Sequence, residues 1–350
     1  MSANPTPAGT VAASEPSTEV LLGVRDLTVN FRVARGTWPW QKATLHAVNG
    51  ISFDVRRGET LGLVGESGCG KSTLARAVIG LAPIAAGSVK WRGEETVLGT
   101  RRTLDTLRRD VQMIFQDPLA SLDPRMSIGE IVAEPLRTHA PQMGRQEIER
   151  RVLIMLERVG LNVHHAARRA HEFSGGQCQR VGIARALIGG PELVICDEPV
   201  SALDVSIQAQ IVNLLRDLQR ELALSLLFVA HDLAVVKTIS HRVMVMYLGR
   251  VMELGTCEAV YDGALHPYTQ ALLDAVPVPD PALGRARRVP PLTSEIPSPL
   301  NPPSGCAFRT RCPAASQMCV GATPAFRTDA TGQSIAACWH PREAGGSRPA

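Results

Sequence analysis

Eight consecutive residues that begin at Gly65 have the composition of a loop that holds phosphate groups. They are Gly65-Glu66-Ser67-Gly68-Cys69-Gly70-Lys71-Ser72, followed by Thr73, and they fit the pattern G-x-x-x-x-G-K-[ST]. Glycines let backbone N–H groups turn toward phosphate oxygens, and the N-terminus of a following helix adds its positive dipole end. Lys71 then reaches the outer phosphates, and the Ser72 hydroxyl suits Mg²⁺. The alternative interpretation is a glycine-rich turn without a function.

A second chemical element is a pair of acids at the end of the apolar run 193–196. Asp197 can hold Mg²⁺ directly or through water. Glu198 can orient and polarise an attacking water, which a hydrolysis reaction requires. Such acids can instead cap a helix or face solvent, but the phosphate loop favours a nucleotide-hydrolysing site.

The elements that must position these residues follow from hydrophobic periodicity. Residues 20–55 alternate apolar and polar positions, which predicts antiparallel strands with one buried face. Later runs alternate between continuous apolar strands and helical patterns, so we expect a parallel sheet between helices in an α/β fold. The expected strands are 61–64, 111–115, 193–196, 226–230 and 243–246, and the expected helices are 71–81, 145–159, 177–188, 207–222 and 233–239.

The same patterns divide the chain into segments. Residues 1–19 are rich in Ala, Pro, Ser and Thr and predict a disordered tail. Residues 20–265 form the expected nucleotide-binding domain, within which about 117–176 show helical pattern and no clear strand. Residues 266–350 are expected to be a C-terminal extension, entered through a proline-rich linker.

Composition excludes some classes of protein. The formal charge of +4 over 350 residues comes with no dense Lys/Arg block, so we expect no nucleic-acid partner. No run of about 18 apolar residues predicts a transmembrane helix, and the N-terminus lacks the pattern of a signal peptide. We therefore expect a cytosolic chain that associates with a membrane only through partners.

The segment Ser174-Gly175-Gly176-Gln177 decides between kinds of nucleotide hydrolase. In isolation it is only a helix start with flexible residues before it. Here it lies about twenty residues before the acidic strand, and it resembles the signature of ABC (ATP-binding cassette) ATPases. Phe173 stands where that signature usually has Leu, an exchange of one apolar residue for another. The resemblance implies a P-loop ABC cassette with an antiparallel β subdomain, a helical subdomain and, here, a C-terminal extension.

Further residues match landmarks of that family. Gln116 resembles the glutamine that senses Mg²⁺ and couples to membrane subunits, so it joins Ser72 and Asp197 in the implied magnesium site. Asp204, in Ser-Ala-Leu-Asp, resembles the loop that communicates across a dimer. His231 looks like the switch histidine that contacts the γ-phosphate. The resemblance thus implies Glu198, His231 and Gln116 as catalytic residues.

An aromatic ring commonly stacks on adenine in this family. Phe31 occupies that place in the sequence, although it is equally suited to a strand core. Trp38 and Trp40 are nearby alternatives.

The resemblance extends beyond the cassette. Residues 265–273, 301–306 and 308–313 look like the ATPase subunits of oligopeptide and dipeptide permeases. This implies an ATPase, using ATP and Mg²⁺, on the cytoplasmic face of a membrane. Its implied partners are two membrane-spanning permease subunits, a second homologous ATPase and an extracytoplasmic peptide-binding protein.

Other functions remain open at this stage. Some relatives carry nickel or other small solutes. A soluble ABC protein of DNA repair or translation is disfavoured, because the chain has neither a long coiled coil nor a second cassette. A regulator with an inactive cassette is disfavoured because every catalytic position is filled.

The cysteines give two further predictions. Cys306, Cys312, Cys319 and Cys338 are separated by five, six and eighteen residues, gaps that lack the C-x-x-C pattern of structural zinc. Four thiolates could hold zinc or a [4Fe–4S] cluster, and the resemblance to peptide-permease ATPases implies the cluster, in a structural or docking role. Cys69 lies near a helix N-terminus, which predicts a lowered thiol pKa.

Overall fold

The computed structural model of the chain describes residues 17–34, 42–96, 99–276 and 295–342. Most of the predicted tail 1–19, both Trp38 and Trp40, and the first part of the proline-rich linker lie outside the described residues.

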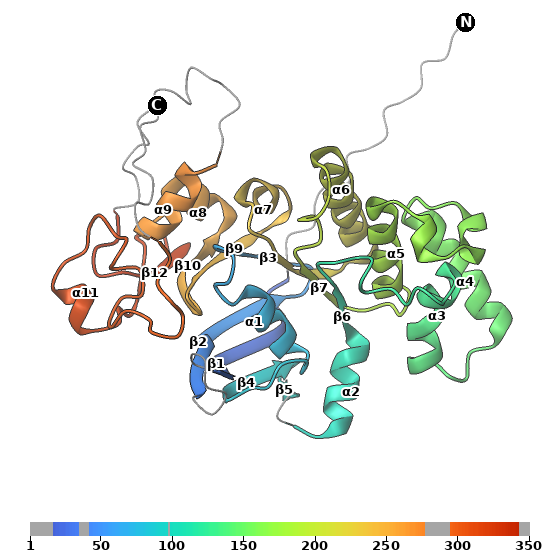
Figure 1. The fold of residues 1–350 in the computed structure, drawn as a ribbon, viewed down its shortest axis with the longest axis horizontal. Coiled ribbons are helices and arrows are strands. Elements are labelled where there is room, and N and C mark those ends of the chain that lie inside the picture. Colours follow the sequence, from blue (N-terminus) through green and yellow to red (C-terminus); the bar gives the residue numbers. More distant parts are fainter. Residues whose placement is uncertain (1–16, 35–41, 97–98, 277–294, 343–350) are drawn as a thin grey trace, which may run out of the picture.

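The central element is a sheet of eight strands in the order β11-β12-β10-β9-β3-β8-β7-β6 (Figure 1). The five strands from β9 to β6 are parallel to one another, and β10, β12 and β11 continue the sheet in antiparallel pairing. The expected parallel sheet is confirmed. Its strands are β3 (Thr60–Val64), β6 (Val111–Ile114), β7 (Leu193–Asp197), β8 (Ser225–Val229), β9 (Arg242–Tyr247), β10 (Arg250–Thr256), β11 (Phe326–Thr328) and β12 (Ser334–Ala337).

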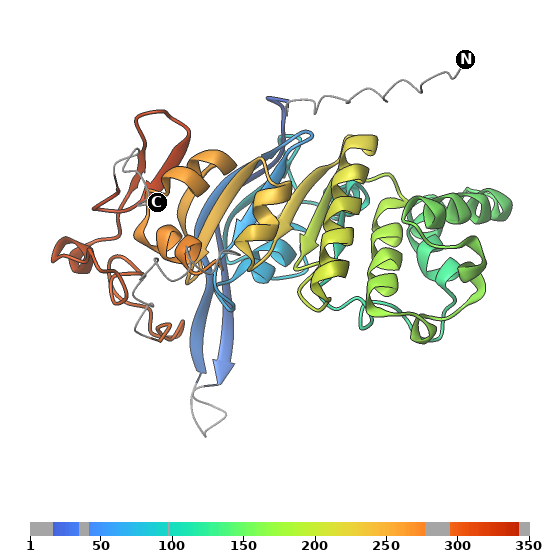
Figure 2. The ribbon, with the colours of Figure 1, turned by 90° about the horizontal axis from the view of Figure 1, so that it is seen from above.

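A second, four-stranded antiparallel sheet has the order β2-β1-β4-β5. Its long strands β1 (Val20–Ala34) and β2 (Lys42–Arg56) pair along their lengths and project from the body as a ribbon (Figure 2). The short strands β4 (Ala86–Trp91) and β5 (Glu94–Glu95) complete it. The alternating pattern of residues 20–55 therefore predicted β1 and β2 correctly, whereas β4 and β5 were missed.

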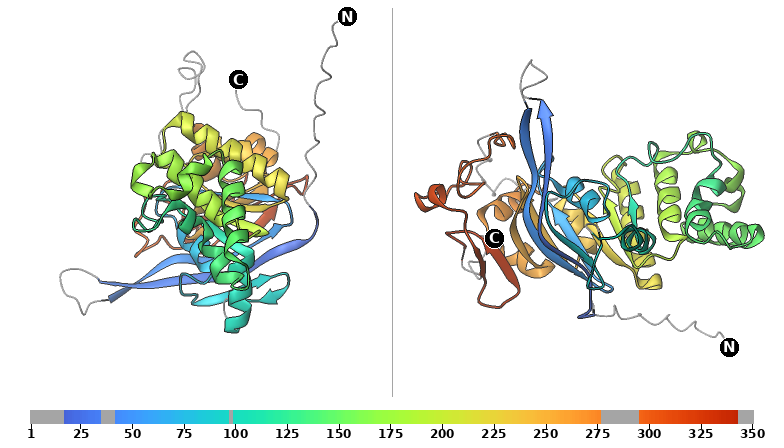
Figure 3. Two further views of the ribbon diagram at one scale, coloured as in Figure 1. Left: turned by 90° about the vertical axis from the view of Figure 1, so that its right-hand side faces the viewer. Right: turned by 90° about the horizontal axis from the view of Figure 1, so that it is seen from below.

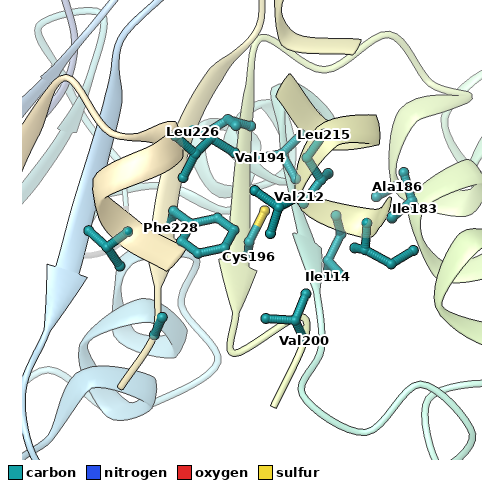
Figure 4. Close-up of a cluster of buried hydrophobic side chains, with 14 of the residues drawn as sticks. Ile114, Ile183, Ala186, Val194, Cys196, Val200, Val212, Leu215, Leu226 and Phe228 are labelled. Atoms are coloured by element: carbon teal, nitrogen blue, oxygen red, sulfur yellow. The ribbon is translucent and has the colours of Figure 1, made fainter. Parts of the chain in front are cut away.

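Both faces of the central sheet are covered, and successive strand residues belong to different cores. Leu193 and Ile195 pack toward α1 (Lys71–Val78) and the antiparallel sheet, whereas Val194 and Cys196 pack toward the helices on the other face. Figure 4 shows this second core, where Phe228 and Cys196 meet Val212 of α6 (Val205–Leu222). Burial on both faces explains why these strands are continuously apolar.

Helices form a lobe beyond strand β6, at one end of the molecule (Figure 3). It contains α3 (Ile128–His139), α4 (Arg145–Arg158) and two 3₁₀ helices at Val163–Ala167 and Ala170–Glu172. Helix α5 (Gly175–Leu187) packs against α3 and connects the lobe to the sheet domain. Helix α2 (Arg101–Asp110), which precedes β6, was not predicted from the sequence.

The C-terminal residues build on the opposite edge of the sheet. After α7 (Leu233–Ile239) and strands β9 and β10 come the helices α8 (Cys257–Gly263) and α9 (Pro267–Asp274). Residues 295–342 add α11 (Met318–Gly321) and the pair β11–β12, and β12 joins β10 through Glu253 to Gly255. Within the described residues, the segment after 295 thus shares a sheet with the cassette. The division of the chain at residue 265 stays a prediction.

No helix in the described ranges combines the length and the apolar character needed to cross a bilayer.

Candidate nucleotide site

The phosphate loop connects the buried strand β3 to α1, as its sequence predicted. Gly65 has φ +155° and Gly70 has φ +105°, in the region that favours glycine. A Cβ atom on Gly65 would lie 2.2 Å from the carbonyl oxygen of Met246, and one on Gly70 would lie 2.2 Å from that of Ala47. The loop is therefore pressed against backbone on two sides, and both positions require glycine.

Lys71 lies at the centre of the loop with only 4% of its surface exposed. Its Nζ donates to the carbonyl oxygens of Gly65 at 2.8 Å and Glu66 at 3.1 Å. The same nitrogen is 3.9 Å from a carboxylate oxygen of Glu198. The ammonium group is thus fixed inside the ring of loop residues, between the loop and the acidic strand end.

Ser72 and Asp197 meet at the base of the loop. The Ser72 hydroxyl donates to Asp197 Oδ1 at 2.6 Å, although 125 residues separate the two. Asp197 is fully buried, and burial raises the pKa of its carboxyl, with the Ser72 hydrogen bond opposing that shift. Its other oxygen, Oδ2, has no hydrogen-bond partner and lies 3.5 Å from the guanidinium of Arg76. A buried carboxylate oxygen that has no hydrogen bond and lies beside a serine hydroxyl fits a hard, oxygen-preferring cation such as Mg²⁺.

Glu198 is held by contacts from three segments. It is a non-glycine residue with φ +47°, a conformation that surrounding structure must stabilise, and its N–H donates to Val229 O at 3.0 Å. Its Oε2 accepts from Gln116 Nε2 at 3.0 Å and lies 3.5 Å from His231 Nδ1. The structure therefore brings all three predicted catalytic residues together around one carboxylate.

Two cavities adjoin this cluster. One of about 260 Å³ lies over the loop, and one of about 580 Å³ lies between Ser67, Glu198 and His231. Phe31 and Leu45 line the first cavity on its apolar side, so Phe31 is placed where an adenine ring could stack. Pro299, from the C-terminal segment, lines the same cavity. The other predicted residues that line it are Ser67, Gly68, Gly70, Lys71, Ser72, Thr73, Gln116 and Glu198.

The signature residues begin helix α5 and do not line either cavity. Ser174 is the N-cap: Gln177 N donates to its hydroxyl at 3.4 Å, and Gln177 Oε1 accepts from Ser174 N at 3.0 Å. A Cβ on Gly176 would lie 2.7 Å from Ile207 Cγ2, so this glycine lets α5 approach α6. Ser174 and Gly175 are exposed, and the signature therefore faces outward from this chain.

Asp204 is also exposed, at the N-terminus of α6. The loop before it is tied to Glu198, because Ser201 Oγ donates to Glu198 O at 3.1 Å. Gln208 Nε2 donates to Val200 O and Leu203 O, which fixes the loop from the helix side. Val205, next in sequence, is 82% exposed, an unusual position for an apolar side chain.

The predicted iron–sulfur cluster is wrong. Within the described ranges, which include Cys306, Cys312, Cys319 and Cys338, no group of three or more His, Cys, Asp or Glu side chains could hold a metal ion. Burial raises the pKa of the Cys306, Cys312 and Cys338 thiols, the last to about 11. Cys306 and Cys319 instead pack in the main core.

The expected reactivity of Cys69 is also not supported. The thiol is 4% exposed, and burial raises its pKa despite the nearby Lys71. Desolvation here outweighs the favourable effect of the charge and the helix terminus.

Two residues next to the loop were missed by sequence reasoning. Tyr268 Oη accepts a hydrogen bond from Glu66 N at 3.0 Å, and Arg311 donates to both carboxylate oxygens of Glu66 at 2.7 and 3.0 Å. Both belong to the segments 265–273 and 308–313, whose resemblance to peptide-permease ATPases was noted. Nothing in the spacing of the sequence indicates that they return to residue 66.

The comparisons with known proteins agree with this geometry. The family described as ABC transporter matches residues 48–201, and that described as oligopeptide/dipeptide transporter, C-terminal region, matches residues 252–319. The oligopeptide transport ATP-binding protein OppF of Escherichia coli is 60% identical over 308 residues, covering 87% of this chain and 92% of the relative. This chain belongs to the family of oligopeptide-transport ATP-binding proteins.

Other members and solved structures extend the likeness. AppF of Bacillus subtilis, an oligopeptide transport ATP-binding protein, is 48% identical over 321 residues, covering 91% of this chain and 97% of AppF. A post-hydrolysis dimer of the ATP-binding cassette MJ0796 with ADP and Pi has a TM-score of 0.61 at 27% identity, covering 68% of this chain and 99% of the cassette. The ABC ATPase fold that the signature predicted is therefore confirmed for this family member.

Proposed function

We propose that this chain hydrolyses ATP at the site formed by the phosphate loop, Asp197 and Glu198, and that each residue has the role its position permits. The observation that carries the proposal is the convergence of Gln116, His231 and Lys71 on the carboxylate of Glu198. Loop N–H groups and Lys71 bind the phosphates, and Phe31 stacks on the base. The remaining loop residues, Gly65 to Thr73, supply the backbone that encloses the phosphates.

Glu198 is the residue that accepts a proton from the attacking water. Its carboxylate is 13% exposed and faces the larger cavity, where water can approach. Gln116 fixes one oxygen of the carboxylate, and His231 lies on the open side of the same oxygen. The water is thereby oriented between the acid and the phosphate that leaves.

The cation implied by ATP hydrolysis has fitting residues. Ser72, Asp197 and Gln116 would hold Mg²⁺, and Asp197 Oδ2, which has no hydrogen bond, supports this assignment. When bound, Mg²⁺ neutralises charge on the phosphate oxygens.

A second ATPase subunit completes the site. Ser174 to Gln177 face outward, and so do Asp204 and Val205 at the next helix start. An exposed signature cannot serve the phosphate loop of its own chain, so it serves that of a partner across a dimer, as in the dimeric cassettes to which this chain is similar. ATP closes the two chains around each other, and hydrolysis releases them.

Hydrolysis powers peptide import. The relatives named OppF and AppF are oligopeptide transport ATP-binding proteins, and this chain works like them at the cytoplasmic face of the membrane. Its partners are permease subunits that span the membrane, a homologous ATPase and a substrate-binding protein outside.

The contact with the permease lies in the groove between α2, β6 and α3. This groove has a volume of about 1060 Å³ and is lined by the arginines 101, 102, 108, 109 and 185. Strand β6 forms its floor and leads directly into Gln116. A permease segment bound in this groove would contact β6, and the neighbouring strand β7 leads to Glu198. This contact provides a physical route that couples the permease to ATP hydrolysis.

Reconstitution in vesicles tests the proposal. The chain, its homologous ATPase, the permease subunits and the binding protein are assembled, and uptake of a labelled oligopeptide is measured with ATP hydrolysis. Lys71→Ala should abolish ATP binding and uptake together, whereas Lys90→Ala, an exposed lysine on β4, should change neither.

Two results would contradict the proposal. Uptake that continues in Lys71→Ala would show that this loop does not supply the energy. Uptake of nickel without oligopeptide, under the same conditions, would replace the assigned substrate while leaving the ATPase role intact.

A further inference from the structure

Glu66 of the phosphate loop is held through its backbone and its side chain. Its N–H donates to Tyr268 Oη at 3.0 Å, its carbonyl accepts from Lys71 Nζ at 3.1 Å, and its carboxylate forms an ion pair with Arg311. Neighbouring Ser67 and Gly68 are exposed. The conformation at the start of the loop is therefore fixed by side chains that follow it by about two hundred residues or more.

Arg311 approaches from the C-terminal segment and is itself almost fully enclosed. Its side chain is 5% exposed, and its guanidinium donates to both oxygens of Glu66 at 2.7 and 3.0 Å. It also lies 3.5 Å from Tyr247 Oη and over that ring, 5.8 Å from its centroid. A bidentate pair of this kind is directional as well as strong.

The segment that carries Arg311 is anchored by an aromatic cluster. Phe308 is fully buried, and its ring packs against Tyr247 at 5.4 Å and Tyr268 at 5.2 Å between centroids. Tyr247 is the last residue of strand β9, and Tyr268 is the second residue of helix α9. Because this aromatic cluster fixes the backbone beside it, Arg311 reaches Glu66 from a rigid support.

The charge of Glu66 makes this contact relevant to nucleotide binding. A free carboxylate at the start of the loop would repel the negative phosphates that the loop must hold. Arg311 pairs with both oxygens of that carboxylate and neutralises its charge. Removal of Arg311 would leave a partly buried, unpaired charge next to the phosphate site.

We infer that Arg311 is a positioning residue for ATP: it neutralises and orients Glu66, and through it sets the affinity of the phosphate loop. The C-terminal segment, which forms one edge of the central sheet, thereby also contributes to ATP binding at the phosphate loop. The lining of the nucleotide cavity by Pro299 supports the same view from an independent contact. This inference rests on the proposed role of the loop in binding ATP.

The test compares ATP affinity and steady-state hydrolysis in the assembled transporter for single and double variants. Arg311→Met should raise KM and Kd for ATP by a factor of roughly 5 to 30, as loss of one or two kcal/mol does, with a smaller change in kcat. Affinity for adenosine, which lacks phosphates, should be unchanged. Adding Glu66→Gln to Arg311→Met should recover much of the ATP affinity, because the unpaired charge is removed.

The matched control is Arg309→Met, since Arg309 lies in the same segment but donates to Ser304 O at 2.9 Å and not to the loop. It should behave as wild type. An Arg311→Met variant within twofold of wild type, or one that Glu66→Gln does not improve, would overturn the inference. If Arg311→Met does not fold, Arg311→Gln, which keeps hydrogen-bonding groups but has no charge, decides in the same way. Loss of ATP binding in Lys71→Ala with a normal Arg311→Met would reject only this inference and leave the proposed function intact.

Discussion

The amide nitrogen of Gln116 lies 3.0 Å from a carboxylate oxygen of Glu198, although 82 residues separate the two in sequence. Gln116 follows β6, Glu198 follows β7, and the two strands are parallel neighbours. The carboxyl ends of adjacent parallel strands therefore place both side chains at one edge of the sheet. Because β6 also forms the floor of the proposed permease groove, a shift of β6 would reach Glu198 through this hydrogen bond.

Replacement of Glu198 tests its proposed role as the base that accepts a proton from the attacking water. Glu198→Gln keeps the size of the side chain and loses the charge that polarises water. We expect ATP to bind normally and steady hydrolysis to fall by on the order of 10²-fold or more, with the closed ATPase dimer accumulating. Glu258→Gln, at an exposed position on α8, is the control and should hydrolyse ATP normally. Near-normal turnover of Glu198→Gln would remove Glu198 from the role of base.

Two serine N-caps of similar chemistry distinguish an effect on stability from an effect on the proposed contact between ATPase chains. Ser127 caps α3 and Ser174 caps α5, each in a reciprocal hydrogen-bond pair with the residue three positions on. Either change to alanine should lower the free energy of unfolding by about 1 kcal/mol, measurable by urea denaturation. Only Ser174→Ala should also lower ATP hydrolysis in the assembled transporter, since only Ser174 belongs to the segment that we propose faces a partner's phosphates. Equal hydrolysis in both variants would show that the signature serine acts merely as a cap.

The nucleotide side of the site could be predicted because its chemistry is local in sequence. Gly65 to Ser72 are consecutive, and Asp197 and Glu198 are adjacent at the end of β7. Residue type and spacing therefore predict most of this part of the site. Their mutual contacts follow once the strands are known to be parallel. The left-handed conformation of Glu198 could not be anticipated, because tertiary contacts impose it on a residue that disfavours it.

The C-terminal segment could not be predicted in the same way. Its strand β12 is a four-residue run, Ser-Ile-Ala-Ala, too short for a periodic signal. Its cysteines suggested a metal because the segment has few aliphatic residues of its own. The missing apolar partners come from the cassette instead, since Phe308 and Cys306 pack into the main core. Such long-range burial leaves no local pattern, and for the same reason Arg311 was missed.

The loop glycines give a prediction with a steric basis. In Gly70→Ala, the new Cβ would meet Ala47 O at 2.2 Å in a backbone conformation with φ +105°. The loop must then shift, so we expect loss of ATP binding, measured by titration. Gly144→Ala is the control, because Gly144 precedes α4 with φ −64° and no atom within 4 Å of the new Cβ. A Gly70→Ala protein with normal ATP affinity would show that the approach of residue 47 is not required.

The stability of the C-terminal region should depend on the protonation of His266. This residue caps α9, where its Nδ1 accepts from Tyr268 N at 3.0 Å, and its ring is 1% exposed. Burial lowers its pKa from 6.5 to about 4, so the folded chain binds a proton less readily than the unfolded chain. Stability is then fully present above pH 6.5 and is lost as the pH falls toward 4, by up to about 3 kcal/mol.

Thermal unfolding between pH 4 and 7 measures this effect, with His266→Asn as the informative variant. Asparagine also caps helices but does not titrate, so the variant should be less stable at pH 7 and show a flatter decline on acidification. The buried Glu253, whose carboxylate accepts from His266 N at 3.0 Å, has a pKa raised by burial and acts in the opposite direction, destabilising the fold as pH rises above 4.5. Glu253 therefore cannot cause the loss of stability at acidic pH. His139→Asn, at an exposed position on α3, should keep the wild-type slope, and an unchanged slope in His266→Asn would assign the acid sensitivity to another group.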